Sequence, residues 1–417
     1  RLLAGKSFSP RIHSRLRTPT RVWAAPGGFW TGKSTRKKGK HMTFQEIKEQ
    51  DSRYILHTYG RVDVALVKGQ NARAWDGAGK EYIDFTSGIG VNALGYADPQ
   101  WAKAVAGQAG AIQHLCNYYY SPQNTGLAQE LCQAAGMAQA FFCNSGAEAN
   151  ECAFKVARKY GEKRGASTIL TLTDSFHGRT LATLAATGQE AFHKDFQPLN
   201  PGFAYAQAND LEAVREKLDG SVCAVLLETV QGEGGVVPME EGFLHEVQAL
   251  CQEKDVLFML DEVQAGVGRT GYFYSCQQWG LSPDVITTAK GLGGGLPIGA
   301  CLVAERLRDI LKPGQQGSTF GGNPVVCAGA REVVRRVSQP EFLQQVREKG
   351  AYLTEKLSAL PQVEAVRGRG LMLGVKLKKG DAHDVLVKCA EKGLLILTAK
   401  ALVRFLPPLT ITKEDID

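Results

Sequence analysis

The chain of 417 residues is long enough for two domains, and its 44% apolar and 22% charged residues match globular averages. That composition excludes collagen-like, disordered and coiled-coil proteins, and no apolar run reaches the roughly eighteen residues of a membrane-spanning helix. The net charge of +7 comes from residues 1–41, which hold eleven Lys or Arg and no Asp or Glu; the remaining chain carries −4 and shows no nucleic-acid-binding pattern.

Residues 1–41 form a basic extension ahead of Met42 and of the first helical pattern, residues 44–50. An organellar transit peptide has this Arg- and Ser-rich, acid-free composition. Translated upstream sequence, or sequence added during cloning, explains it as well, and a nucleic-acid-binding tail is a third interpretation. We expect a cytoplasmic protein, or one of an organelle matrix if the extension is a transit peptide.

The next elements predicted are a hairpin over residues 72–85, turning at residues 76–79, and a helix over residues 99–113 with Pro99 in its first turn. Apolar runs and helical patterns then alternate. Strands are predicted at residues 140–143, 168–172, 222–227, 256–260 and 285–288, and helices at residues 147–163 and 242–254. The run 222–227 is apolar on both faces, as buried parallel strands are. This alternation predicts an α/β domain with a largely parallel sheet.

After residue 325 helices and strands follow in mixed order. Helices are predicted at residues 325–338, 340–359 and 382–391, and strands at residues 363–366, 371–376, 394–398 and 403–406. These elements predict a second, smaller α+β domain, with the boundary between the two domains inside residues 325–340.

Ten cysteines are scattered along the chain without a C-x-x-C pair or a zinc-ligand spacing with His. Most lie in apolar runs, as Cys143 and Cys223 do, so we expect reduced, buried thiols in a reducing compartment and no metal site. A catalytic cysteine is disfavoured because no base lies near any of them in the sequence.

Three polar motifs follow predicted strands, and ligands of open α/β sheets bind beyond the carboxyl ends of the strands. The first, Asn-Ser-Gly-Ala-Glu at residues 144–148, joins a strand to a helix. Small side chains there let backbone N–H groups approach a phosphate at the helix N-terminus. For this motif alone, Ser145 acting only as a helix cap is an equal alternative.

Asp261 and Lys290 each follow a buried strand. A charged Asp261 costs roughly several kcal/mol unless it is paired, so we expect it to face a cation or a protonated heterocycle, although an Asp that caps a turn is equally common. Lys290, followed by glycines, could lose its proton by desolvation, whereas a surface lysine is the simpler interpretation of that motif alone. Together, a phosphate cradle, a buried carboxylate and a strand-end lysine are what pyridoxal phosphate requires.

Residues 47–417 resemble the class III, ornithine-type, pyridoxal-phosphate aminotransferases of fold type I. In chain order, the segments that carry the resemblance are residues 145–150, 175–180, 231–235, 261–271, 289–291, 317–324 and 404–409. The resemblance implies a large domain at residues 96–330, with a mainly parallel seven-stranded sheet. It also implies a small α+β domain formed by residues 42–95 and 331–417, and a homodimer with shared active sites.

The resemblance further implies roles for single residues around the cofactor. Lys290 would hold the aldehyde of pyridoxal 5′-phosphate covalently and later move the substrate's proton. Asp261 would pair with the pyridine nitrogen, and Gln264 with the ring hydroxyl. Val263 and Phe176 would cover the two faces of the ring.

The phosphate has its own implied residues. Backbone N–H groups of Gly146 and Ala147, with Ser145 nearby, would hold it. Thr319 of the partner subunit would complete the phosphate site; from the sequence pattern alone, Thr319 is an ordinary turn residue.

Two arginines fit a substrate with two ends. Arg179 would bind the carboxylate of acetylornithine, and Arg404 the α-carboxylate of 2-oxoglutarate or glutamate, although pattern alone also allows Arg404 to be a surface residue of an edge strand. Glu233 would neutralise Arg404 in one half-reaction and release it in the other. Ser318 would contact acetylornithine, and Glu228, which ends a buried strand, receives no role.

Within the class, the segments at residues 289–295 and 317–324 resemble the acetylornithine branch more than the 4-aminobutyrate branch. They imply a transaminase of arginine biosynthesis that uses N2-acetyl-L-ornithine and 2-oxoglutarate. Ornithine, succinylornithine and N-succinyl-diaminopimelate are alternative substrates, and an aminomutase or a cofactor-binding regulator is an alternative of another class. Family chains usually continue past the segment 411–417, so we expect further sequence beyond Asp417. They commonly have Pro where Thr229 stands, so we expect a locally altered turn there.

Overall fold

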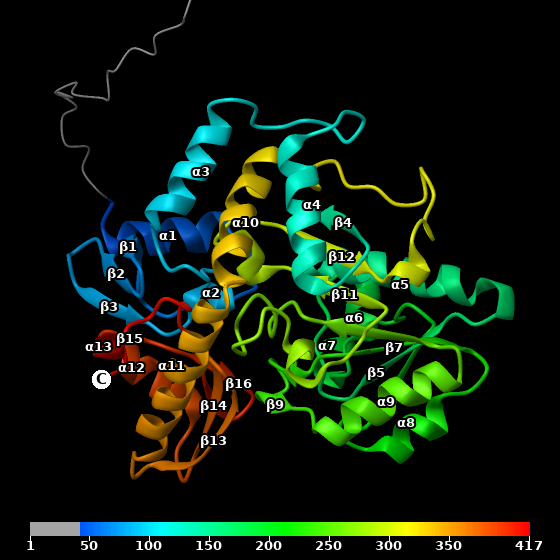
Figure 1. Ribbon diagram of the computed structural model, residues 1–417. Helices are drawn as coiled ribbons and strands as arrows, with labels where there is room; N and C mark the ends of the chain where they lie inside the picture. Colours follow the sequence, from blue (N-terminus) through cyan, green and yellow to red (C-terminus); the bar gives the residue numbers. More distant parts are fainter. Residues whose placement is uncertain (1–41) are drawn as a thin grey trace, which may run out of the picture. The chain divides into compact units, whose positions relative to one another are not determined.

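The apolar runs in the middle of the chain form one seven-stranded sheet in the computed structural model, which describes residues 42–417 (Figure 1). In spatial order its strands are β4 (Gln139–Cys143), β12 (Gly299–Val303), β11 (Val285–Thr288), β10 (Leu257–Asp261), β7 (Val222–Leu227), β5 (Thr168–Leu172) and β6 (Phe203–Ala206). Six of these strands run in the same direction, and β12 runs antiparallel to them. The predicted, mainly parallel sheet is confirmed, while the basic extension and its interpretations lie outside the described residues.

Helices cover both faces of this sheet, and others, such as α11 and α12, pack on two smaller sheets. They are α1 (Phe44–Tyr54), α2 (Ser87–Gly90), α3 (Pro99–Ala109), α4 (Pro122–Ala135), α5 (Gly146–Gly161), α6 (Leu181–Ala186), α7 (Glu190–His193), α8 (Leu211–Lys217), α9 (Glu241–Glu253), α10 (Pro324–Val337), α11 (Pro340–Ser358), α12 (Ala382–Glu391) and α13 (Lys413–Ile416). Leu226 of β7 packs in one apolar cluster with residues of α5, and its neighbours Val225 and Leu227 pack in another with residues of α9. Successive strand side chains point to opposite faces, so a run that is apolar at every position must be covered twice.

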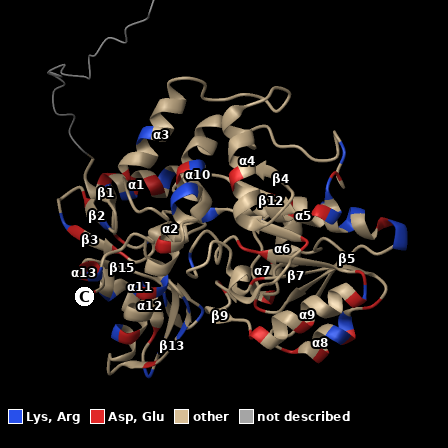
Figure 2. Cartoon of the chain, in the orientation of Figure 1, with Lys and Arg blue, Asp and Glu red and all other residues tan. Residues whose placement is uncertain are grey.

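Charged side chains lie mainly on the outer helices, and the central strands β5 and β7 carry none (Figure 2). All ten cysteines are unpaired and seven of them are buried, as predicted, while Cys116 is exposed. Within residues 42–417, no helix combines the length and the apolar character needed to cross a membrane.

Two four-stranded sheets and a short hairpin complete the fold. One sheet has the order β13 (Val363–Arg369), β14 (Met372–Leu377), β17 (Leu402–Phe405), β16 (Leu397–Ala399), and the other has the order β1 (Leu66–Gln70), β2 (Arg73–Asp76), β3 (Glu81–Asp84), β15 (Leu394–Leu395). The hairpin pairs β8 (Val230–Gln231) with β9 (Val237–Pro238). The parallel pairing of β15 with β3 joins the N-terminal hairpin to the C-terminal part of the chain. The division into a large and a small domain at residues 96 and 331 stays a prediction.

Two predicted elements are wrong in their extent. The single strand predicted at residues 394–398 is two strands, because the chain leaves one sheet after Leu395 and enters the other at Leu397. An apolar run carries no signal for such a change of partner. The helix predicted to reach residue 113 ends at Ala109, with Gly110 as its C-cap.

Candidate active site

A cavity of about 420 Å³ opens beyond the carboxyl ends of β4, β5, β7, β10 and β11. Its volume lies in the range of small-molecule sites, about 300–1,000 Å³. Eight of the predicted site residues line it: Ser145, Gly146, Ala147, Phe176, Asp261, Val263, Gln264 and Lys290. The parallel strands thus bring together side chains that lie up to 145 positions apart in the sequence.

The first turn of α5 forms one end of the cavity. Ser145 caps the helix, since its Oγ accepts a hydrogen bond from the Glu148 N–H at 3.2 Å. The N–H groups of Gly146 and Ala147 have no acceptor inside the helix because they belong to its first turn, where the helix dipole also favours an anion. A Cβ on Gly146 would lie 2.8 Å from Val263 Cγ1, so glycine is needed for this close approach. Ser145 is therefore a helix cap, as one interpretation held, and it also borders a site suited to a phosphate.

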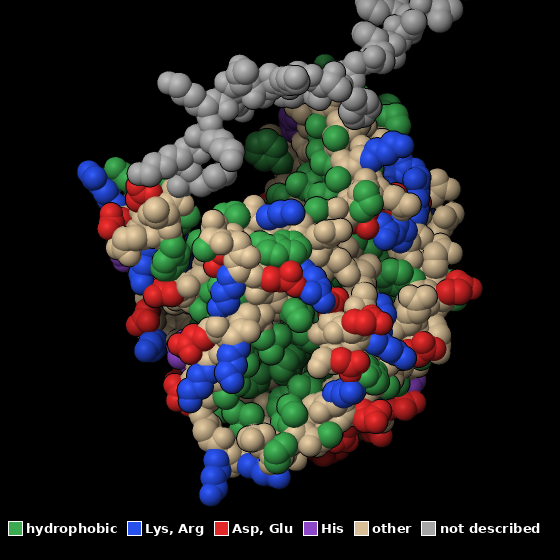
Figure 3. Space-filling model, turned by 90° about the vertical axis from the view of Figure 1, so that its left-hand side faces the viewer, with side chains coloured by type: hydrophobic (Ala, Val, Ile, Leu, Met, Phe, Trp, Pro, Cys, Tyr) green, Lys and Arg blue, Asp and Glu red, His purple; other side chains and the backbone are tan. Residues whose placement is uncertain are grey.

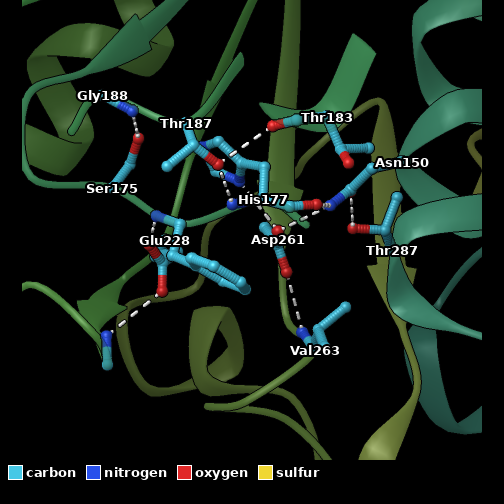
Figure 4. A network of polar contacts seen from close by, with 12 residues as sticks. Asn150, Ser175, His177, Thr183, Thr187, Gly188, Glu228, Asp261, Val263 and Thr287 are labelled. Carbon is cyan, nitrogen blue, oxygen red and sulfur yellow. Dashed lines mark hydrogen bonds and ion pairs between the residues drawn. The ribbon is translucent and has the colours of Figure 1, made fainter. Parts of the chain in front are cut away.

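Asp261 lies at the centre of a buried polar network and is 4% exposed (Figure 4). Its Oδ2 accepts hydrogen bonds from Asn150 Nδ2 and His177 Nδ1, each at 2.8 Å, and its Oδ1 accepts one from the Val263 N–H at 3.0 Å. Because an ionised carboxylate can only accept, the proton of the His177 ring resides on Nδ1. The carboxylate is thereby held in one orientation at the cavity wall.

Asn150 is itself held in place from the neighbouring strand. Its Oδ1 accepts a hydrogen bond from Thr287 Oγ1 at 2.7 Å, and its Nδ2 also donates to the His177 carbonyl at 2.8 Å. Sequence reasoning assigned no role to Asn150, His177 or Thr287. The helical spacing of Asn150, four residues after Gly146, is the one signal that could have placed it beside the cavity.

Lys290 begins the turn that follows β11. Its φ of 42° lies in the left-handed region, which is uncommon for a residue with a side chain and recurs at functional sites. Burial lowers the pKa of the Lys290 ammonium; the negative field of Glu233 opposes this, and the positive field of Arg404 adds to it. The result is an amine that gives up its proton more readily than a surface lysine.

Arg404 lies beside this cavity, on β17, an inner strand of its sheet. Its side chain is 3% exposed and forms an ion pair with Glu233 at 2.6 Å; the Glu233 side chain is 29% exposed. Gln264 contacts both, accepting from Arg404 Nη1 at 3.3 Å and donating to Glu233 Oε1 at 3.4 Å. The interpretation of Arg404 as a surface residue of an edge strand is therefore wrong.

The charge state of Glu233 follows from this pairing. Burial by itself raises the pKa of the Glu233 carboxyl, but the adjacent Arg404 guanidinium outweighs it, so the pKa is lowered overall. The ion pair is fully formed at pH values above the ordinary pKa of a glutamate carboxyl group. It is lost as the pH falls through the lowered pKa of Glu233.

Arg179 stacks on aromatic rings at the exposed side of the same region. Its guanidinium carbon lies 4.1 Å from the centre of the Phe192 ring and 5.5 Å from that of Phe176. Stacking uses the flat face of the guanidinium and leaves its N–H edge directed elsewhere, as carboxylate binding requires. Among residues 42–417, Arg179 forms no ion pair.

Ser318 and Thr319 do not line the cavity of Lys290. They border a separate cavity of about 740 Å³, together with Tyr118. Ser318 Oγ accepts a hydrogen bond from Asn144 Nδ2 at 3.2 Å, and Thr319 is exposed. Ser318 therefore contacts the rim of the Lys290 cavity through Asn144, although neither Ser318 nor Thr319 lines that cavity.

The network around Asp261 can be tested through Asn150, which is 1% exposed. Thr287→Val removes the donor to Asn150 Oδ1 and leaves that oxygen buried without a partner, so we expect the free energy of unfolding to fall by about 1–3 kcal/mol. Thr288→Val is the matched control, because Thr288 is equally buried and its Oγ1 has no hydrogen-bond partner within residues 42–417. Urea denaturation of the two variants measures the difference, and equal losses of stability would contradict the network.

Comparison with known proteins agrees with this geometry. The family "Aminotransferase class-III" matches residues 54–417. The acetylornithine aminotransferase of Haemophilus ducreyi is 49% identical over 90% of this chain and 97% of its own length. The N-acetylornithine aminotransferase structure from Stenotrophomonas maltophilia has 38% identity and a TM-score of 0.76, covering 88% of this chain and 94% of its own.

The solved structure of an enzyme with a different activity is also similar. The ornithine aminotransferase of Toxoplasma gondii has 32% identity and a TM-score of 0.86, covering 90% of this chain and 93% of its own. The seven-stranded sheet with its strand-end cavity and the family match lead to the same conclusion. The chain belongs to the class III aminotransferases, enzymes that depend on pyridoxal 5′-phosphate.

Proposed function

We propose that this aminotransferase moves the terminal amino group of N2-acetyl-L-ornithine to 2-oxoglutarate. The products are N-acetyl-L-glutamate 5-semialdehyde and L-glutamate, in a step of arginine biosynthesis, and the two substrates use one site in turn. The observation that carries the proposal is the buried Arg404 paired with Glu233 near Lys290. Relatives that are 42–49% identical over about 90% of the chain bear the name acetylornithine aminotransferase and support the choice of amine.

The cavity has the donor set that pyridoxal 5′-phosphate needs. The start of α5 offers N–H groups to the phosphate, and a Cβ at Gly146 would fill that place. Asp261 would pair with the pyridine nitrogen, Gln264 with the ring hydroxyl, and Phe176 and Val263 would cover the two ring faces. When bound, the cofactor supplies an electron sink and carries the amino group between the two substrates.

Lys290 is the catalytic residue of the proposal. Its Nζ would take the proton from the amino-bearing carbon of acetylornithine and hold it within the cavity, and it would act in the reverse direction during glutamate formation. Burial lowers the pKa of the Lys290 ammonium and so favours the neutral form that this role needs.

Arg404 and Glu233 let one site accept unlike substrates. While acetylornithine reacts, Glu233 neutralises Arg404, so the buried guanidinium is not left without a carboxylate. When 2-oxoglutarate enters, its α-carboxylate replaces that of Glu233, whose partly exposed side chain can turn toward solvent. Arg179 binds the carboxylate at the other end of the substrate.

We further propose a homodimer in which Ser318 and Thr319 act in the site of the partner subunit. Large apolar side chains lie exposed near Thr319: Phe320 is 61% exposed, and Tyr118 and Tyr120 are 95% exposed. Hydrophobic patches open to solvent are also present on the side of the molecule seen in Figure 3. Surfaces of this kind are typical of protein interfaces.

A second candidate is ornithine aminotransferase, favoured by the TM-score of 0.86 to the Toxoplasma gondii structure. The TM-score reports the backbone, whereas side-chain identity governs specificity and is higher for the N-acetylornithine enzyme, at 38% against 32%. Succinylornithine, 4-aminobutyrate and N-succinyl-diaminopimelate are further amines to compare.

A spectral titration of the purified holoenzyme distinguishes these amines. We expect acetylornithine to bleach the absorbance of the aldehyde form of the cofactor at the lowest concentration, and 2-oxoglutarate to restore it. Ornithine and 4-aminobutyrate should require concentrations that are higher by roughly ten-fold or more, since each lacks contacts made by acetylornithine. Preferential bleaching by ornithine or 4-aminobutyrate would refute the proposed substrate.

The roles of the gate residues predict an asymmetric defect. Arg404→Lys keeps the charge but loses the bidentate geometry, so we expect the half-reaction with 2-oxoglutarate to slow by roughly 10- to 100-fold and that with acetylornithine much less. Arg158→Lys is the control, because it makes the same exchange at an arginine that lies away from the cavity, where it stacks on the Phe203 ring. Single-turnover absorbance measurements give both rates, and equal losses in the two half-reactions would count against the assignment.

A further inference from the structure

Glu228 is a buried carboxylate at the cavity that the mechanism does not use. It follows β7 directly, is 6% exposed and lines the same cavity as Lys290. Its Oε1 accepts a hydrogen bond from the Phe176 N–H at 2.9 Å, and its Oε2 accepts one from the Gly232 N–H at 3.1 Å (Figure 4). One side chain therefore joins two backbone segments that follow different strands.

These two segments carry Arg179 and the partner of Arg404. The loop after β5 carries Phe176 and, three residues later, Arg179. The tip of the β8–β9 hairpin carries Gly232 and, next to it, Glu233, which forms an ion pair with Arg404 of β17. The carboxylate of Glu228 thus joins the loop of Arg179 to the hairpin tip that contacts Arg404, and under the proposed function these two arginines bind opposite carboxylates of 2-oxoglutarate.

The hairpin tip has little freedom on its other sides. A Cβ on Gly232 would lie 2.2 Å from Gln264 Oε1, which shows how closely the backbone packs against that amide. Gln231 Nε2 donates to the Thr173 carbonyl at 2.8 Å, and Arg367 donates to the Gly235 carbonyl at 2.6 Å. A displacement of the tip at Gly232 would therefore be passed on to Gln264 and to the ion pair that Gln264 contacts.

Both bonds of Glu228 require two acceptor oxygens, which only the ionised carboxylate provides in full. Burial raises the pKa of Glu228 to about 7; the nearby His177 opposes the rise and Asp261 adds to it. Burial disfavours the ionised form of Glu228, and the two backbone hydrogen bonds stabilise that form.

We infer that Glu228 is a positioning residue that sets the spacing between the Phe176–Arg179 loop and the Gly232–Glu233 hairpin tip. This spacing makes the site selective for an oxo acid with two carboxylates over one with a single carboxylate. The inference rests on the proposed function, since it assumes that Arg179 and Arg404 each bind one carboxylate. Glu228 would act through the Phe176 and Gly232 N–H groups that it holds.

The test compares 2-oxoglutarate with pyruvate, which has one carboxylate, as amino acceptors for the holoenzyme. Glu228→Gln keeps the size of the side chain but replaces one acceptor oxygen by an NH₂ group, which cannot accept from a backbone N–H. We expect kcat/KM for 2-oxoglutarate to fall by roughly 10- to 100-fold, mainly through KM, and that for pyruvate by less than about three-fold. Discrimination between the two acceptors should therefore collapse.

Glu262→Gln is the matched control. Glu262 is 1% exposed and accepts from the Ser275 and Cys276 N–H groups at 3.0 and 2.9 Å, but does not line the cavity. Its other neighbour, Ser275 Oγ, donates to Glu262 at 2.6 Å and contacts Thr229, the residue that stands in place of the usual Pro. We expect Glu262→Gln to lower the melting temperature while leaving the ratio of the two kcat/KM values unchanged.

A second variant, Glu228→Asp, keeps both acceptor oxygens on a shorter stem and covers the case in which Glu228→Gln does not fold. It should also lose discrimination, because the stem draws the two segments to a different spacing. Equal losses for both acceptors in the Glu228 variants, unchanged ratios, or the same change of ratio in Glu262→Gln would overturn the inference. Failure of the proposed function would instead appear in the unmodified enzyme, as no turnover of acetylornithine with 2-oxoglutarate.

Discussion

The hydrogen bonds that hold Asp261 are the interaction on which the rest of the site depends. A carboxylate that is 4% exposed is costly unless donors surround it, and Asn150, His177 and the Val263 N–H supply them. Each donor comes from a different part of the fold: α5, the loop after β5 and the turn after β10. The hydrogen bonds to this one carboxylate therefore fix the positions of α5, of the loop after β5 and of the turn after β10 relative to one another.

Arg404, Glu233 and Arg179, the proposed substrate-binding residues, lie around this fixed centre on other parts of the chain. Arg404 comes from a second sheet, Glu233 from a hairpin tip and Arg179 from a loop, so their alignment relies on bridging contacts such as Gln264. This arrangement separates two tasks. Under the proposed function, the centre around Asp261 would hold the cofactor, and the ion pair of the buried Arg404 with the partly exposed Glu233 would open for one substrate and close for the other.

Much of the fold could be predicted from the sequence because its strands are short apolar runs with local boundaries. The strands at residues 168–172, 222–227 and 285–288 have the predicted ends. Elements that depend on distant partners could not be predicted in this way. The change of sheet between Leu395 and Leu397 is one example, and β12, antiparallel in a parallel sheet, is another.

The site shows the same limit. Lys290, Asp261 and the start of α5 could be predicted because each motif joins a strand to a loop or helix and has a chemical purpose of its own. Asn150, His177 and Thr287 look like ordinary polar residues until the fold brings them to Asp261. The roles proposed for Ser318 and Thr319 would depend on a second chain, which no single-chain pattern describes.

The most direct test of this account is the protonation state of the pyridine nitrogen in the holoenzyme. Cofactor labelled with ¹⁵N at that position reports it by NMR. The account predicts a protonated nitrogen near neutral pH in the unmodified enzyme, and loss of that proton in Asp261→Asn, because the facing carboxylate is what stabilises it. An unprotonated nitrogen in the unmodified enzyme would show that Asp261 does not serve the cofactor.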